Sequence, residues 1–251
     1  MTGIMMSAMN NIAQVSAVTP KVWTGITAGM QFNLLNASSG STWTDDSGNG
    51  YNATLQGTPS FITTNGGGIR LNNSTTVGTD YISVPYNISS STVTVEMVTS
   101  FNSTGYWGSV WGNDAYNSSA GYFAYQGGST GITWGKVPSS ATVTITASNS
   151  IRHWVFIING TSYSVYLNGS QLGTTTVQSP AQTSFTSNNF YFGARHNNDG
   201  TGATDKLNNS TAANYPVFYQ MRVYNTAFSA ANVTTNYNAV KSSTPGGYGL
   251  P

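Results

Sequence analysis

Apolar and polar residues alternate along much of the chain in short runs. The clearest run covers residues 92–101, where Val93, Val95 and Met97 fall on one side and Thr94 and Glu96 fall on the other. A period of two is typical of a β-strand with one face in a core. This run is therefore predicted to be a central strand of a sheet.

Shorter runs of the same kind lie between clusters of Gly, Asn and Ser, such as 66–68 and 72–74. Further strands are predicted at 30–35, 53–56, 68–71, 81–85, 131–135, 141–146, 190–195 and 217–225. Short strands separated by turn residues indicate an antiparallel all-β architecture.

Two Asn-Gly pairs predict tight hairpins. Asn159-Gly160 separates the apolar runs 152–158 and 162–167, and Asn168-Gly169 follows the second run. Asn-Gly favours the two-residue turns whose twist matches that of paired strands. A meander of three strands is expected here.

The two ends of the chain differ from the part between them. Residues 1–29 contain four methionines and predict an N-terminal arm, either a docking or assembly segment or an end that lies along the domain. Ser229 is a candidate N-cap for a short helix with Val233, Tyr237 and Val240 on one face. We therefore expect an arm at 1–29, a single domain at 30–240 and an extended tail at 241–251.

The polar turn at residues 45–55 carries a recognisable motif. Its residues are Asp45, Ser47, Gly48, Asn49, Gly50, Asn52 and Leu55. They resemble the D-x-S-G-N-G-N-x-G-x-L signature near the start of laminin-G-like, concanavalin-A-like domains.

Later segments carry the same resemblance. They are the cassette of Trp154, Val155, Tyr166, Leu167, Asn168 and Gly169, the strand 190–195, and the closing strand 220–229. The resemblance covers about 30–240 and implies a two-sheet antiparallel jelly-roll sandwich. Val98 and Gln220 depart from it, standing where the family has a tryptophan and an acid.

Composition excludes several functions. The chain has 8 Lys and Arg residues and 7 Asp and Glu residues, so its net charge is +1. It therefore lacks the excess of positive charge that nucleic-acid binding requires. Cysteine is absent, so thiol catalysis is excluded. No apolar run is long enough to span a membrane, and the N-terminus lacks the basic region of a signal peptide. A net charge near zero favours association, so a homo-oligomer is expected.

Candidate catalytic groups are few, and the chain is predicted not to be an enzyme. Glu96 is the single glutamate, whereas a retaining glycosidase needs two carboxylates about 5 Å apart. His153 is predicted to be structural, on a strand, and His196 to be a solvated loop residue. Glu96 is expected to form an ion pair, either with Arg222 or with Arg152, because an unpaired charge inside a strand is costly.

Two kinds of binding site remain as candidates. Asp45, Asp46 and Asn49 supply oxygens of the type calcium prefers, but they equally suit an Asx-turn bonded to its own backbone; calcium is the one cofactor considered. A Gly/Asn-rich aromatic segment suits carbohydrate, although the same residues suit a core or a protein interface. Its aromatic residues are Tyr106, Trp107, Trp111, Tyr116, Tyr122 and Tyr125.

Two functions follow from this pattern. The charge-poor Gly/Ser/Thr/Asn surface is similar in style to bacteriophage virion proteins, particularly marine-phage structural proteins. The first interpretation is a non-enzymatic virion protein, a capsid decoration or fibre component, that contacts other virion proteins or its own copies and host-surface glycans. The alternative is a secreted or cell-surface carbohydrate-binding adhesin module.

Overall fold

A computed structural model defines the fold. It describes residues 21–251 except 38, 75–77, 89, 102–105, 114–120, 128–130, 136–139, 146–147, 149, 177–188, 197–201, 210 and 244–247.

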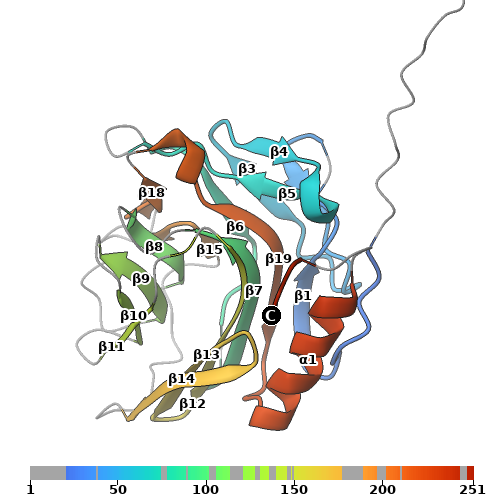
Figure 1. The fold of residues 1–251 in the computed structure, drawn as a ribbon, viewed down its shortest axis with the longest axis vertical. Coiled ribbons are helices and arrows are strands. Elements are labelled where there is room, and N and C mark those ends of the chain that lie inside the picture. Colours follow the sequence, from blue (N-terminus) through green and yellow to red (C-terminus); the bar gives the residue numbers. More distant parts are fainter. Residues whose placement is uncertain are drawn as a thin grey trace, which may run out of the picture.

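Two antiparallel sheets form the body of the molecule (Figure 1). The first, sheet A, contains in spatial order β14 (Ser170–Thr176), β13 (Ser162–Leu167), β12 (Ile151–Asn159), β7 (Thr92–Ser100), β19 (Val217–Tyr224), β5 (Gly68–Arg70) and β4 (Ser60–Ile62). β1 (Met30–Leu34) also pairs with β19. Sheet A therefore joins strands from both ends of the chain.

Sheet B is the opposing layer. In spatial order it contains β11 (Ser140–Thr144), β10 (Gly131–Gly135), β9 (Phe123–Gly127), β8 (Tyr106–Gly112), β15 (Phe190–Phe192), β6 (Tyr81–Val84), β3 (Ala53–Gln56) and β2 (Thr42–Trp43), with β18 (Asn208–Asn209) on β8. The remaining elements are β16 (Arg195–His196), β17 (Ala203–Thr204), the short 3₁₀ helices Thr64–Gly66 and Ala212–Asn214, and helix α1 (Ala230–Ser242). This arrangement confirms the predicted two-sheet sandwich with a short C-terminal helix.

The predicted hairpins are present. β12 pairs with β13 across Gly160, and β13 pairs with β14 across Asn168 and Gly169. Gly160, Asn168 and Gly169 all have positive φ, at 61°, 49° and 80°. Asn and Gly are the residues that adopt this conformation at least cost, so the local sequence decides where the strands reverse.

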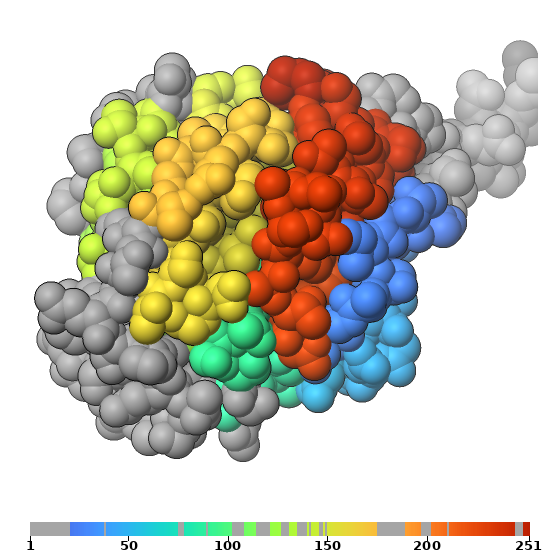
Figure 2. Space-filling view, turned by 90° about the horizontal axis from the view of Figure 1, so that it is seen from below, coloured from blue at the N-terminus to red at the C-terminus, as the bar shows by residue number. Residues whose placement is uncertain are grey.

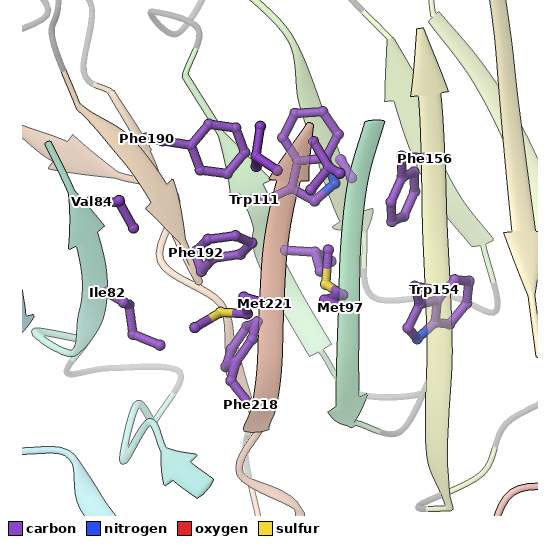
Figure 3. Packing of buried hydrophobic residues seen from close by; sticks show 14 of the residues in the cluster. Ile82, Val84, Met97, Trp111, Trp154, Phe156, Phe190, Phe192, Phe218 and Met221 are labelled. Carbon is purple, nitrogen blue, oxygen red and sulfur yellow. The ribbon is translucent and has the colours of Figure 1, made fainter. Parts of the chain in front are cut away.

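Large aromatic side chains fill the space between the sheets (Figure 3). The Trp111 and Phe190 rings stack with centroids 5.5 Å apart, and Phe156 meets Trp111 edge-on at 5.6 Å. Trp154 stacks on Phe156 from the same strand, two residues away. Such pairs add to the free energy gained by burying their area.

Both faces of β7 are buried, although the period of two assigned only one face of this central strand to a core. Val93, Val95 and Met97 belong to the core between the sheets, as the period of two predicts. Thr94 and Glu96, on the other face, are buried as well. The reason is that α1 and residues 21–30 cover this outer face of sheet A.

Helix α1 begins with the predicted cap. The Ser229 hydroxyl accepts a hydrogen bond from the Asn232 backbone, and the Asn232 side chain accepts one from the Ser229 backbone, which forms a capping box. Val233 and Val240 are buried beneath the helix. Figure 2 shows α1 beside the N-terminal segment on one face of the molecule.

The described parts of the two ends pack against the domain. Tyr248 and Leu250 join a cluster with Val240 of α1 and Tyr219 of β19. Lys241 Nζ donates to the Pro251 carbonyl at 2.7 Å. At the other end, the Ile26 backbone donates to Asn236 Oδ1 of α1 at 2.9 Å. Residues 1–20, the larger part of the predicted arm, lie outside the described residues.

Candidate functional site

A buried polar cluster lies between sheet A and helix α1, with Glu96 at its centre. Glu96 Oε1 accepts a hydrogen bond from His153 Nε2 at 2.7 Å. Glu96 Oε2 accepts from the Tyr224 hydroxyl at 3.0 Å and from Asn236 Nδ2 at 2.9 Å. Both carboxylate oxygens are thus used within the protein.

Arg222 supplies the positive charge for this cluster. Its Nη1 lies 3.7 Å from Glu96 Oε1, and its guanidinium stacks over the Trp23 ring with the two centres 3.4 Å apart. Burial by itself raises the pKa of Glu96, but the charge of Arg222 and the hydrogen bonds from His153 and Asn236 outweigh it, so the net pKa is lowered. Glu96 is therefore held as the carboxylate.

Strand pairing explains which predicted ion pair forms. Glu96 lies opposite Arg222 on β19, and the predicted pair between them is present. On β12, Glu96 lies opposite Val155, so alternation puts His153 on its face and Arg152 on the other. The alternative with Arg152 was wrong for this reason. His153 has the predicted structural role, although its pairing with Glu96 was not foreseen.

The acidic turn is bonded to its own backbone. Asp45 accepts hydrogen bonds from the backbone amides of Asn33, Ser47 and Tyr51 at 2.8–2.9 Å, and from the Ser47 hydroxyl. Asn49 Nδ2 donates to the Met30 and Gln31 carbonyls. This geometry is that of the Asx-turn alternative. Within the described part of the chain, no three His, Asp or Glu side chains gather closely enough to hold a metal ion.

These bonds predict the effect of removing the Asp45 carboxylate. Asp45→Ala leaves several backbone amides without acceptors, so we expect unfolding to become easier by roughly 2 to 3 kcal/mol. Chemical denaturation in the presence and absence of millimolar calcium measures this. The loss should be the same with and without calcium. Asp46→Ala, a variant of the exposed neighbouring residue, should change the free energy of unfolding by only about 0.5 kcal/mol. Calcium-dependent stabilisation that disappears in Asp45→Ala would instead establish a metal site.

A pocket of about 520 Å³ adjoins this turn. Residues 21–30, strand β1 and the turn itself enclose it. Its lining residues are Lys21, Val22, Trp23, Thr27, Met30, Asn33, Leu35, Asn36, Asp46, Ser47 and Asn49. Asp46 and Asn49 were predicted as metal ligands, and the structure places them at the rim of a pocket that the sequence did not reveal.

The pocket wall contains an unsatisfied polar atom. Asn33 is almost completely buried, and its Oδ1 has no hydrogen-bond partner. Asn36 is fully engaged by contrast, because its amide donates to Asp46 Oδ2 and to the Lys21 carbonyl, both at 3.1 Å, and its oxygen accepts from the Lys21 backbone. Asn33 is thus the pocket residue that still needs a hydrogen-bond donor.

Lys21 is a buried amine at one side of the pocket. Burial, reinforced by the charge of Arg222, lowers the pKa of Lys21 to about 7. Its Nζ donates to the Gly67 carbonyl at 3.3 Å and lies over the Tyr248 ring. Lys21 therefore lines the pocket and also contacts distant parts of the fold through its amine.

The lowered pKa predicts a pH-dependent stability. The unfolded chain keeps the Lys21 proton up to its ordinary pKa of 10.5, whereas the folded chain loses it near pH 7. The free energy of unfolding should therefore rise between pH 7 and 9, by up to about 1.4 kcal/mol per pH unit. Denaturation of Lys21→Met should show a flatter profile, and the exposed Lys241→Met should keep the original slope. Parallel profiles for Lys21→Met and the original chain would contradict this assignment.

The predicted aromatic site is not assembled as expected. Trp111 and Tyr122 are core residues and cannot offer a surface to a sugar. This corrects their prediction. The irregularity of β8 between Ser109 and Trp111 brings both Val110 and Trp111 into the core, and Tyr122 packs on Tyr163. Tyr125 is half-buried, 5.6 Å from the Arg195 guanidinium. Tyr116 and the side chains of Tyr106 and Trp107 lie outside the described residues.

His196 is buried, contrary to the expected solvated loop residue. It belongs to β16, where its Nε2 lies 2.9 Å from the Asn189 carbonyl and its ring packs on Tyr191 at 4.1 Å. Its neighbour Arg195 forms an ion pair with Asp205 of the adjoining turn. The contacts of His196 with Tyr191 of β15 and with the Asn189 carbonyl account for this burial, while β16 pairs with β17 in a separate two-stranded sheet.

The architecture defines a class, the two-layer β-sandwich with a helix on the outer face of one sheet. No protein-family model matches the chain, and no curated protein matches its sequence. The laminin-G-like relationship therefore stays a resemblance. Among the described residues, no helix has the length and apolarity that a membrane crossing requires.

Solved structures with this fold include several toxin domains. The receptor-binding domain of botulinum neurotoxin C/D mosaic serotype aligns with a TM-score of 0.63 and 14% identity over 85% of this chain and 52% of that one. The binding domain of Paraclostridial Mosquitocidal Protein 1 gives 0.62 and 16%, over 85% and 53%. A botulinum neurotoxin type C structure, described as dependent on two ganglioside molecules for cell entry, gives 0.63 and 11%, over 85% and 52%. The chain thus spans about half the length of these neighbours.

Proposed function

We propose that this protein is a non-enzymatic binding module whose sandwich presents a recognition surface for glycans. The main support is the state of Glu96. The only glutamate of the sequence is fully buried and hydrogen-bonded through both oxygens, so it has no access to a substrate. Structural neighbours that are described as receptor-binding or as dependent on gangliosides also support a binding role.

Within that role, we propose a place on a virus particle, as a capsid decoration or a fibre component. The support is compositional. Charged residues make up 6% of the chain, against roughly 25% in average soluble proteins, and a surface with little charge suits dense packing against identical copies. Its partners would be other virion proteins or its own copies.

A secreted or cell-surface adhesin is the second candidate. The likeness to solved domains that are described as receptor-binding or binding domains of toxins favours it. Light scattering and particle composition separate the two candidates. A virion component should form defined oligomers and be detected by mass spectrometry in purified particles, whereas an adhesin should be monomeric and absent from them.

A glycan array probed with the full-length protein tests the shared proposal. We expect binding to a restricted set of glycans and no turnover of a panel of glycoside substrates. Hydrolysis of any of them would contradict the non-enzymatic assignment. Failure to bind any glycan on the array would remove carbohydrate recognition from the proposal.

A further inference from the structure

We infer that the pocket between residues 21–30, β1 and the 45–49 turn is a subsite for a neutral sugar residue. This inference rests on the proposed glycan-binding function and gives it a location. The pocket volume of about 520 Å³ falls within the range of roughly 300–1,000 Å³ that is common for ligand sites. It is large enough for one or two sugar rings.

Two groups of this pocket are hydrogen-bond acceptors that a ligand could use, Asn33 Oδ1 and the Asp46 carboxylate. Asn33 Oδ1 is buried without a partner, and a buried polar atom in that state costs free energy until a donor reaches it. The Asp46 carboxylate accepts a hydrogen bond from Asn36 Nδ2 and is exposed at the rim of the pocket. A ligand rich in hydroxyl donors would satisfy Asp46 at the rim directly, and it would satisfy Asn33 Oδ1 by displacing the side chains that enclose this atom in the pocket wall.

Charge in the pocket selects against other ligands. An acidic sugar would bring its carboxylate to the rim that carries Asp46, where like charges repel. Lys21 offsets this only in part, because its Nζ is bonded to the Gly67 carbonyl and burial lowers its pKa to about 7, and Arg222 is already paired with Glu96. A metal cation would meet Lys21 on the wall and the Arg222 guanidinium behind Trp23. Neutral hydroxyls carry neither penalty.

A fixed aromatic and aliphatic surface completes the site. Trp23 lines the pocket together with Val22, Met30 and Leu35. Its indole Nε1 donates to the Ile26 carbonyl at 3.0 Å, and one ring face rests on Arg222. The ring is thereby held before any ligand arrives, which lowers the entropic cost of binding. Sugar C–H groups can pack on such a surface while hydroxyls bond to Asp46 and Asn33.

Titration with defined sugars tests this inference. The full-length protein is titrated with methyl glycosides of glucose, galactose, mannose and N-acetylglucosamine, and with lactose and sialyllactose, by calorimetry and saturation-transfer NMR. We expect at least one neutral sugar to bind in the presence of EDTA. Asp46→Asn and Asn33→Leu should each weaken its binding by about tenfold with no loss of melting temperature. Asp205→Asn, a carboxylate variant outside the pocket, should leave affinity unchanged.

Several outcomes would overturn the inference. Unchanged affinity in both pocket variants would exclude the pocket, as would binding that requires calcium or a preference for sialyllactose. Loss of binding in Tyr125→Ala alone would move the site to the other sheet and preserve the general proposal. If no sugar in the panel binds, the glycan array decides: positive spots leave glycan recognition standing without this subsite, and a blank array removes both.

Discussion

Glu96→Gln is expected to lower the free energy of unfolding by about 3 to 5 kcal/mol. The amide keeps the size of the side chain but removes the charge, so the buried Arg222 loses its counter-ion 3.7 Å away. The amide also has a single acceptor oxygen, whereas the carboxylate serves His153, Tyr224 and Asn236. Urea denaturation, followed by circular dichroism, measures the loss.

Asp205→Asn is the matched control, because Asp205 pairs with Arg195 in a partly exposed position. Its loss should stay below about 1 kcal/mol. If Glu96→Gln is no more destabilising than this control, the cluster does not stabilise the fold.

Acid should reproduce the effect of Glu96→Gln in the unmodified protein. The folded pKa of Glu96 lies below its ordinary value of 4.5. Its contribution is therefore complete above pH 4.5 and is lost as the pH falls through the folded pKa. The variant should lack this part of the acid dependence.

Trp111→Ala is expected to destabilise the protein by about 3 to 5 kcal/mol. The indole is buried between the sheets, stacked on Phe190 and in edge contact with Phe156 (Figure 3). Removing it leaves a cavity that the stacked neighbours cannot close. Thermal and chemical denaturation should both report the loss, and Trp111→Phe, which keeps an aromatic ring, should lose less.

The half-buried Tyr125 offers a comparison from the same predicted aromatic group. Tyr125→Ala should cost much less stability than Trp111→Ala, because more of its ring already contacts water. A nearly normal stability of Trp111→Ala, combined with lost sugar binding, would return Trp111 to the list of ligand-contacting residues.

Local sequence determined many of the strands, the hairpins and the helix cap, but β8 and β9, within the segment 106–127, were not predicted. Alternation placed Val93, Val95 and Met97 in the core, and the Asn-Gly pairs positioned two turns, because these features depend on residues close together in the chain. The two-sheet sandwich followed from the many short strands and from the motif resemblance. Glu96 was expected to pair with Arg222 or Arg152 because charges inside strands need partners, and the pair with Arg222 is present.

Tertiary structure alone decided which residues of sequence-distant strands lie opposite each other. His153 meets Glu96, and Asn33 lies beside Arg222, only through the register of strands far apart in the sequence. The pocket requires residues 21–30 to fold back over β1, and no local pattern encodes that return. Period-two alternation states which residues share a face but not whether that face meets water, another sheet or a helix. That choice depends on long-range packing, which buries Thr94 and Glu96 on the second face of β7.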